Sequence, residues 1–189
     1  MLLLPDPPLA DARVRLRPWE AGDASVLLGG ACDPLVRRFR RSIPDDPDLD
    51  WAAAWLAAAA RQAADGTRLE LAVCDGAASG APVGSVALWG IHRRNADAMV
   101  SWWLGADGRG RGLGAAAVTL LARYAFDALG MERLAASIEE SNAASRALAE
   151  RCGFVPEGRL RSYQRLRDGS RVDCLSYSLL AHELRPGPR

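Results

Sequence analysis

The sequence predicts an α/β (α+β) fold in which one mixed β-sheet is covered by helices. Apolar runs of strand length alternate along the 189-residue chain with segments whose apolar residues recur at helical spacing. Between the strand expected over residues 99–104 and the helix expected over 113–129 lies a glycine-rich turn. The elements read β-αα-ββ-β-α-β-α-ββ, and this length suffices for one well-buried domain.

In the first half of the chain, alternation and helix-capping residues mark the elements. Val14–Arg17 alternates apolar and basic residues and stops at Pro18, as a half-buried strand would. Asp33 is a candidate N-cap, as is Asp48 or Asp50. The expected elements are a strand over 14–17, short helices over 21–29 and 34–41, a longer helix over 48–65, and strands over 69–74, 83–91 and 99–104.

The second half continues with two further helices and a closing hairpin. Gly130 and Gly153 are placed to end helices, and Asp168-Gly169 is a hairpin turn. The expected elements are helices over 113–129 and 142–152 and strands over 133–138, 160–166 and 172–180. We expect a flexible lead over 1–12, a single domain over 13–181 and a tail over 182–189.

The glycine-rich turn reads Arg109-Gly110-Arg111-Gly112-Leu113-Gly114. The first amides of a helix have no intrahelical partner and lie at the positive end of its dipole, so they bind phosphate oxygens. Glycines allow close approach to the main chain and positive φ angles, and the two arginines would add charge-assisted hydrogen bonds. A pyrophosphate-sized anion is therefore the expected ligand of this loop.

Composition limits the classes of partner and of site. The net charge of +1 indicates neither a nucleic acid nor an anionic membrane as partner. The four cysteines are far apart and form no C-x-x-C, which favours a reduced cytoplasm and indicates no metal. No apolar run approaches membrane-spanning length. Four arginines over 37–41 are interpreted as a solvated basic face, with an anion site as the alternative.

Two sequence blocks resemble the GNAT acyltransferase superfamily. Arg109-x-x-Gly112-x-Gly114 after a Trp-Leu strand end is similar to its acetyl-CoA-binding signature. The segment from Glu139 to Gly158 resembles the E-N-x-x-S…E-x-x-G-F…E-G block of the RimJ/RimL-like branch, which acetylates amino termini of ribosomal proteins. The resemblance covers residues 13–181. It implies a twisted mixed sheet of about seven strands, splayed at its centre and flanked by about four helices.

The resemblance also implies a reaction, direct transfer of an acetyl group from acetyl-CoA to a primary amine of a peptide N-terminus or a small molecule. Ser145 matches a serine of the RimL-like branch. Many GNAT enzymes carry a tyrosine as proton donor near the position of Ala149, and the resemblance implies that Ser145 takes that role here. Glu70 is the candidate base, with Asp97, Glu139 or water as alternatives. The implied cofactor-binding residues are Trp103, Leu104, Arg109, Gly110, Arg111, Gly112, Leu113, Gly114 and Asn142.

Two alternatives remain open from the sequence. The chain could be a non-catalytic CoA-binding or interaction protein of the same fold, or an acyltransferase that uses a different acyl donor. The sequence does not identify the amine acceptor, and a homodimer is possible. Candidate walls for the acceptor are Trp51, Trp55, Arg161, Tyr163 and Arg165.

Overall fold

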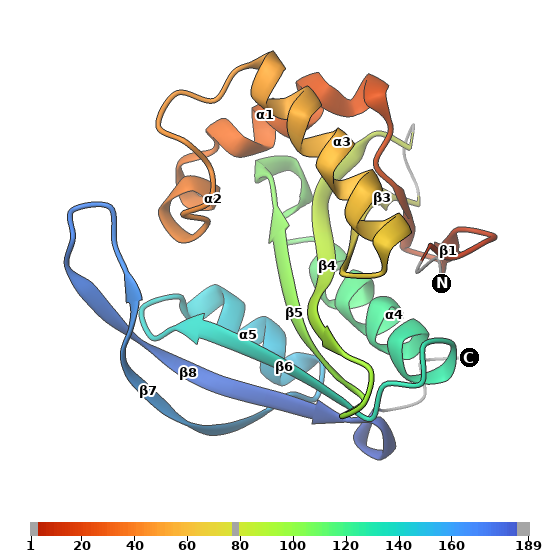
Figure 1. Cartoon of the computed structure of the whole chain (residues 1–189), viewed down its shortest axis with the longest axis vertical. Helices are drawn as coiled ribbons and strands as arrows, with labels where there is room; N and C mark the ends of the chain where they lie inside the picture. The colour runs from red at the N-terminus through yellow and green to blue at the C-terminus, as the bar shows by residue number, and fades with distance from the viewer. Residues whose placement is uncertain (1–3, 77–79, 185–189) are drawn as a thin grey trace.

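The computed structural model describes residues 4–76 and 80–184, and within them one sheet contains eight strands. In spatial order the strands run β1-β2-β3-β4-β5-β6-β8-β7 (Figure 1). Their bounds are β1 (Leu9–Ala10), β2 (Val14–Pro18), β3 (Arg68–Asp75), β4 (Pro82–His92), β5 (Asp97–Leu104), β6 (Arg133–Glu139), β7 (Val155–Arg165) and β8 (Arg171–Leu180). The predicted mixed α/β fold is confirmed.

The described residues form five α-helices, at the five segments expected to be helical, where the family resemblance implied about four. They are α1 (Ala24–Cys32), α2 (Pro34–Phe39), α3 (Leu49–Asp65), α4 (Leu113–Asp127) and α5 (Ala143–Arg151). The side chain of Asp33 caps α2 by accepting from the amides of Leu35 and Val36, and Asp48 caps α3 by accepting from the amide of Trp51. None of the described helices has both the length and the apolar character needed to cross a bilayer.

The strands differ from expectation at two places. Leu9 and Ala10, expected in a loose lead, pair with Leu16 and Arg15 of β2 and add the eighth strand. β7 begins at Val155 instead of residue 160, because the ladder with β8 continues through two register irregularities. Residues 1–3, 77–79 and 185–189 lie outside the described residues, and with them parts of the expected lead, of the 75–82 turn and of the tail.

Two apolar cores lie on opposite sides of the sheet. The larger one packs α4 against β2–β5, with fully buried residues such as Leu71, Leu88 and Leu121. The smaller one lies under α1, α2 and α3 and includes Leu27, Leu56 and others (Figure 1). Its centre is Trp103, which β5 directs toward the N-terminal helices.

The sheet opens between β5 and β6. These two strands are parallel and pair only where Asp97, Ala98 and Met99 face residues 133–135. Beyond Met99, β5 continues along β4 while β6 continues along β8, so the two halves of the sheet diverge toward α2 (Figure 1). The tip of the β7–β8 hairpin arches over this opening, where Arg167 contacts Asp45 and the carbonyl of Ile43. The predicted splay is confirmed.

Candidate active site

The opening between the diverging strands contains a cavity of about 380 Å³, here called the splay cleft. One wall is Val100–Trp102 of β5 and the other is Ala136–Glu139 of β6. The remaining lining residues come from the end of α2, from β3 and β4, from α5 and its N-cap, and from β7; they are Phe39, Arg40, Arg41, Ser42, Arg68, Trp89, Asn142, Ser145 and Gln164.

A second cavity of about 200 Å³, here called the loop channel, adjoins the splay cleft. It extends past Leu148 of α5 to Leu104 and Arg109, where the glycine-rich loop begins. The two cavities share five lining residues: Phe39, Arg40, Trp102, Asn142 and Ser145. A ligand held by the loop can therefore reach Ser145 from one side, and a second ligand can reach it from the splay cleft.

The glycines of the loop serve two different purposes. Gly112 is the N-cap residue of α4 and has a φ of 77°, the left-handed conformation that favours glycine. Gly114 lies inside the helix, and a Cβ there would stand 2.7 Å from Cδ1 of Leu148 and 3.2 Å from Cδ1 of Leu104. Gly112 therefore shapes the turn before α4, whereas Gly114 lets α4 approach α5.

The two loop arginines are held by carboxylates. Arg109 donates from Nε to the carbonyl of Leu104 at 3.0 Å and from Nη2 to Asp33 at 2.5 Å, which ties the loop to α2. Burial acts to raise the pKa of Asp33, but the hydrogen bonds from Arg109 and the α2 amides lower it overall. Arg111 contacts the carboxylate of Asp75 and donates to the carbonyl of Asp107.

Asn142 and Ser145 lie where the splay cleft and the loop channel meet. Oδ1 of Asn142 accepts from the amide of Ser145 at 3.1 Å, so Asn142 is the N-cap of α5. This bond also holds the first turn of α5 against both cavities. The hydroxyl of Ser145 donates to no described residue, and is free to donate to a ligand.

Glu70 lies behind the splay cleft and not on its surface. Its side chain is fully buried, and it accepts hydrogen bonds from Oγ of Ser85 at 2.6 Å and from Nε of Arg68 at 2.8 Å. Nη1 of Arg40 is 3.9 Å from the same carboxylate. The carboxylate on this central strand is thus compensated by ion pairs, and two of its partners, Arg40 and Arg68, line the cleft in its place.

Of the other two candidate bases, Glu139 lines the splay cleft. Its side chain is 10% exposed and accepts from Nη2 of Arg41 at 2.5 Å. Asp97 begins β5 at the closed end of the splay. Hydrogen bonds from Asn95 and His92 lower the pKa of Asp97 despite some desolvation. Glu139 is therefore the better placed of the two.

The comparison with known families agrees with this arrangement. The family model described as the acetyltransferase (GNAT) domain matches residues 13–155, which is more than half of the chain. The protein belongs to the GNAT acetyltransferase family. The splayed sheet and the glycine-rich loop at the start of α4 are the features of this GNAT domain that form its two cavities.

Similar proteins include two from bacilli and one solved structure. YdaF of Bacillus subtilis (strain 168), whose name suggests a ribosomal N-acetyltransferase, is 34% identical to this chain over 104 residues. The match spans 55% of this chain and 56%, just over half, of YdaF. An uncharacterized N-acetyltransferase of Bacillus licheniformis, p20, is 28% identical over 173 residues, 90% of this chain and 94% of p20. RimJ of Mycobacterium smegmatis, solved with CoA-disulfide, shares the fold with a TM-score of 0.77 and 23% identity, covering 92% and 84% of the two chains.

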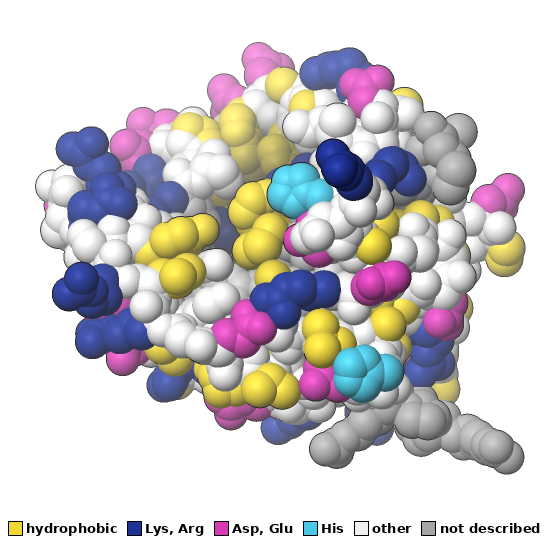
Figure 2. All heavy atoms as spheres, turned by 60° about the horizontal axis from the view of Figure 1, so that its bottom comes forward, with side chains coloured by type: hydrophobic (Ala, Val, Ile, Leu, Met, Phe, Trp, Pro, Cys, Tyr) yellow, Lys and Arg dark blue, Asp and Glu magenta, His cyan; other side chains and the backbone are white. Residues whose placement is uncertain are grey.

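The histidines of this GNAT domain lie away from the two cavities. Both appear on the surface of one face, among charges of both signs (Figure 2). The His92 side chain is 71% exposed and contacts Asp97 at 2.8 Å. His182 is also exposed. Neither residue lines the splay cleft or the loop channel.

The aromatic residues are distributed differently from the sequence prediction. Trp103, predicted to bind the cofactor, stacks on Trp19 in the smaller core and lines the loop channel from there. Trp51 and Trp55, expected in the acceptor wall, pack in the same core, and neither lines the splay cleft. Arg161, Tyr163 and Arg165 are also absent from its lining.

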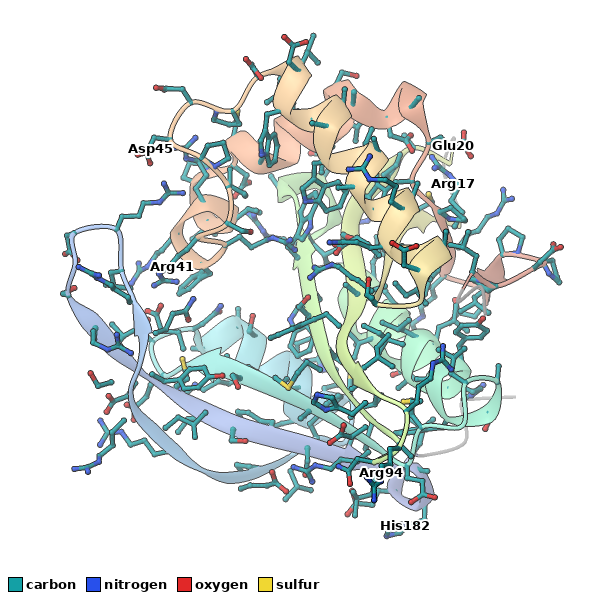
Figure 3. All side chains as sticks on the ribbon, viewed as in Figure 1. Arg17, Glu20, Arg41, Asp45, Arg94 and His182 are labelled. Carbon is teal, nitrogen blue, oxygen red and sulfur yellow. The ribbon has the colours of Figure 1, made fainter. Side chains whose placement is uncertain are left out.

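Sequence reasoning missed the arginines of the splay cleft. Arg40 and Arg41 were grouped with Arg37 and Arg38 as a solvated basic face, yet they line the cleft together with Arg68. Arg41 lies at the lower end of the α2 region, facing the opening (Figure 3). The helix expected over 34–41 ends at Phe39, with Arg40 as its C-cap residue, so Arg40 and Arg41 do not continue the helical spacing of Arg37 and Arg38.

Proposed function

We propose that this protein transfers an acetyl group from acetyl-CoA directly to a primary amine. The observation that carries the proposal is the meeting of two cavities at Ser145, one reaching the glycine-rich loop and the other open between β5 and β6. Membership of the GNAT family supports acetyl-CoA as the acetyl donor, and so does the CoA-disulfide in the RimJ structure.

The residues of the loop fit the donor. The left-handed Gly112 and the first amides of α4 form a turn suited to phosphate oxygens, and Gly110 has a similar positive φ of 72°. Arg109 and Arg111 lie beside the turn and can exchange a carboxylate partner for a phosphate. The arm of the donor would then follow Leu104 and Leu148 along the loop channel to Asn142.

The reaction moves protons at two atoms, the acceptor nitrogen and the thioester sulfur. The ammonium group of the acceptor loses a proton, its nitrogen attacks the thioester carbonyl carbon, the carbon–sulfur bond breaks, and the departing thiolate receives a proton. The hydroxyl of Ser145 faces both cavities and is the proposed donor to the sulfur. The nitrogen releases a second proton as the amide forms, and this proton replaces the one that Ser145 gave to the sulfur. The products are the acetylated amine, CoA thiol and one proton.

For the base we propose Glu139 in place of Glu70. The carboxylate of Glu139 lines the splay cleft, so an ammonium group there can reach it directly or through one water. Glu70 is separated from the cleft by its own partners, Arg40 and Arg68. Glu139 then passes the proton on to solvent, which regenerates its carboxylate.

Thiol release from acetyl-CoA in the presence of an amine panel tests the proposal. Ser145→Ala should lower kcat roughly 100-fold while the affinity for CoA stays unchanged, because the bond to sulfur forms in the transition state. Ser25→Ala, an exposed serine of α1, is the matched control and should behave as wild type. CoA binding without acceptor-dependent thiol release from any amine would instead favour a non-catalytic CoA-binding protein.

A further inference from the structure

The splay cleft contains one guanidinium group whose hydrogen-bonding capacity is unused. The side chain of Arg40 is only 18% exposed and lines both the splay cleft and the loop channel. Its guanidinium donates no hydrogen bond to any described residue. Its Nη1 is 3.9 Å from Oε1 of Glu70, and its Cζ is 6.0 Å from the centroid of the Trp103 ring.

The charges around Arg40 do not cancel. Arg68 forms two short hydrogen bonds with Glu70 and so satisfies that carboxylate, while Arg41 is paired with Glu139 across the cleft. Three guanidinium groups therefore face two carboxylates, and Arg40 is the one in excess. Burial lowers the pKa of Arg40, and the charge of Arg68 acts in the same direction against that of Glu70.

A largely buried charge that makes no hydrogen bond to the described residues, and that shares its one carboxylate partner with Arg68, is costly for the folded protein. Burying an ion without a hydrogen-bonded partner loses hydration that nothing restores, so a cleft residue in this state is a candidate for ligand binding. The five donors of a guanidinium match the planar oxygens of a carboxylate or phosphate. The position beside Ser145 places such an oxyanion close to the transferred group.

Resting on the proposed function, we propose that Arg40 selects the acceptor: an amine that carries an oxyanion, a carboxylate or a phosphate, a few bonds from its nitrogen. Its ammonium group faces Glu139 and Ser145, and its oxyanion binds Arg40. A polyamine would instead add positive charge to a cleft that already has an excess of it.

The first experiment compares matched acceptors by thiol release. The pairs are L-phenylalanine with L-phenylalaninamide and O-phosphoethanolamine with ethanolamine, with spermidine as the cationic comparison. Wild-type kcat/KM should be about 10- to 100-fold higher for the anionic member of each pair, which is the effect expected of one charge-assisted hydrogen bond. The pair with the larger preference shows whether the oxyanion of the acceptor is a carboxylate or a phosphate. Arg40→Gln should remove the preference, whereas Arg38→Gln, an exposed arginine that stacks on Phe39, should keep it.

The second experiment does not depend on turnover. Inorganic phosphate is titrated while tryptophan fluorescence is recorded, since Trp89 and Trp102 line the cleft and Trp103 lies beside Arg40. We expect a saturable change that sodium chloride at equal ionic strength does not produce and that Arg40→Gln loses. Arg40→Gln should also melt at the same temperature as wild type or higher, because it removes an uncompensated charge; a purely structural arginine would lower it.

The outcomes separate the two proposals. Equal turnover of anionic and neutral amines, or a preference for spermidine, overturns the selection by Arg40 and leaves the acetyltransferase proposal standing. Arg40-dependent phosphate binding without turnover of any amine supports the anion site and overturns the proposed reaction. If the phosphate response persists in Arg40→Gln, or is absent from wild type, Arg40 is not the anion-binding residue.

Discussion

A methyl group added at Gly114 should collide with Leu148, and the collision should disappear when Leu148 is shortened. The added Cβ would lie 2.7 Å from Cδ1 of Leu148, and both residues pack where α4 meets α5. Overpacking of this kind costs about 1–3 kcal/mol, while alanine improves helix propensity over glycine by up to about 1 kcal/mol. Gly114→Ala should therefore lower the free energy of unfolding by about 0–2 kcal/mol, or lower Tm by up to roughly 8 °C.

The sign of the effect should reverse in a Leu148→Ala background. That variant alone should cost about 1–2 kcal/mol, because Leu148 is half-buried. Adding Gly114→Ala then meets only Cδ1 of Leu104 at 3.2 Å, a side-chain end that can shift by a few tenths of an ångström. The gain in helix propensity therefore remains, and the double variant should be at least as stable as Leu148→Ala. Urea denaturation followed by circular dichroism measures all four proteins of the cycle.

CoA affinity gives a second readout of the same contact. Leu148 and Leu104 line the loop channel, so a displaced Leu148 side chain should narrow it in Gly114→Ala and weaken CoA binding by calorimetry. Leu148→Ala should restore the affinity in the double variant. Stability effects that add within about 0.5 kcal/mol would refute the predicted collision.

Three further variants test the loop, the buried carboxylate and the loop-to-helix tie. Gly112→Ala should cost about 1–2 kcal/mol, the penalty of a left-handed alanine, and weaken CoA binding; unchanged calorimetry would remove the loop from the donor site. Glu70→Gln should cost about 2–3 kcal/mol in urea, because it leaves Arg68 and Arg40 without a carboxylate; an altered low-pH limb of kcat/KM in a stable variant would return the base to Glu70. Asp33→Asn keeps the cap of α2 but loses the charge paired with Arg109. Because the pKa of Asp33 is lowered in the folded state, its contribution is complete above the unfolded pKa of about 3.8 and is lost below it, so the Tm gap to wild type should be full at pH 6 and shrink below about pH 4.

Local patterns were sufficient for much of the fold and placed the glycine-rich turn at the start of a helix. Capping residues, glycine stops and alternation predicted the helices and nearly all strands, and the two-residue β1 was missed because so short a strand has no period to detect. The turn from Arg109 to Gly114 was recognisable because its glycines and arginines are consecutive in the sequence, and its role in donor binding stays a prediction. Asn142 was expected at a helix start, where it is the N-cap of α5, whereas the catalytic role that the family resemblance implies for Ser145 stays a prediction.

The acceptor side depended on contacts between distant segments. Arg41 and Glu139 form an ion pair although they are 98 positions apart in the sequence. The pairing of β3 with β4 brings Ser85 to Glu70, from which it is separated by 15 positions. Gly112 and Gly114 look alike in the sequence, yet one needs a positive φ and the other needs space beside Leu148. The cytoplasmic location, the homodimer and the domain limits stay predictions from the sequence.

The sequence by itself determined which residues form strands and helices, and where an anion-binding turn begins a helix, because hydrogen bonding and hydrophobic periodicity act over a few neighbouring residues. Only the tertiary structure decided which side chains face the splay cleft. The excess charge of Arg40 exists because Arg68 satisfies Glu70 and Arg41 is paired with Glu139. That balance depends on the packing of α2 against the opened sheet, and no local spacing of residues encodes it.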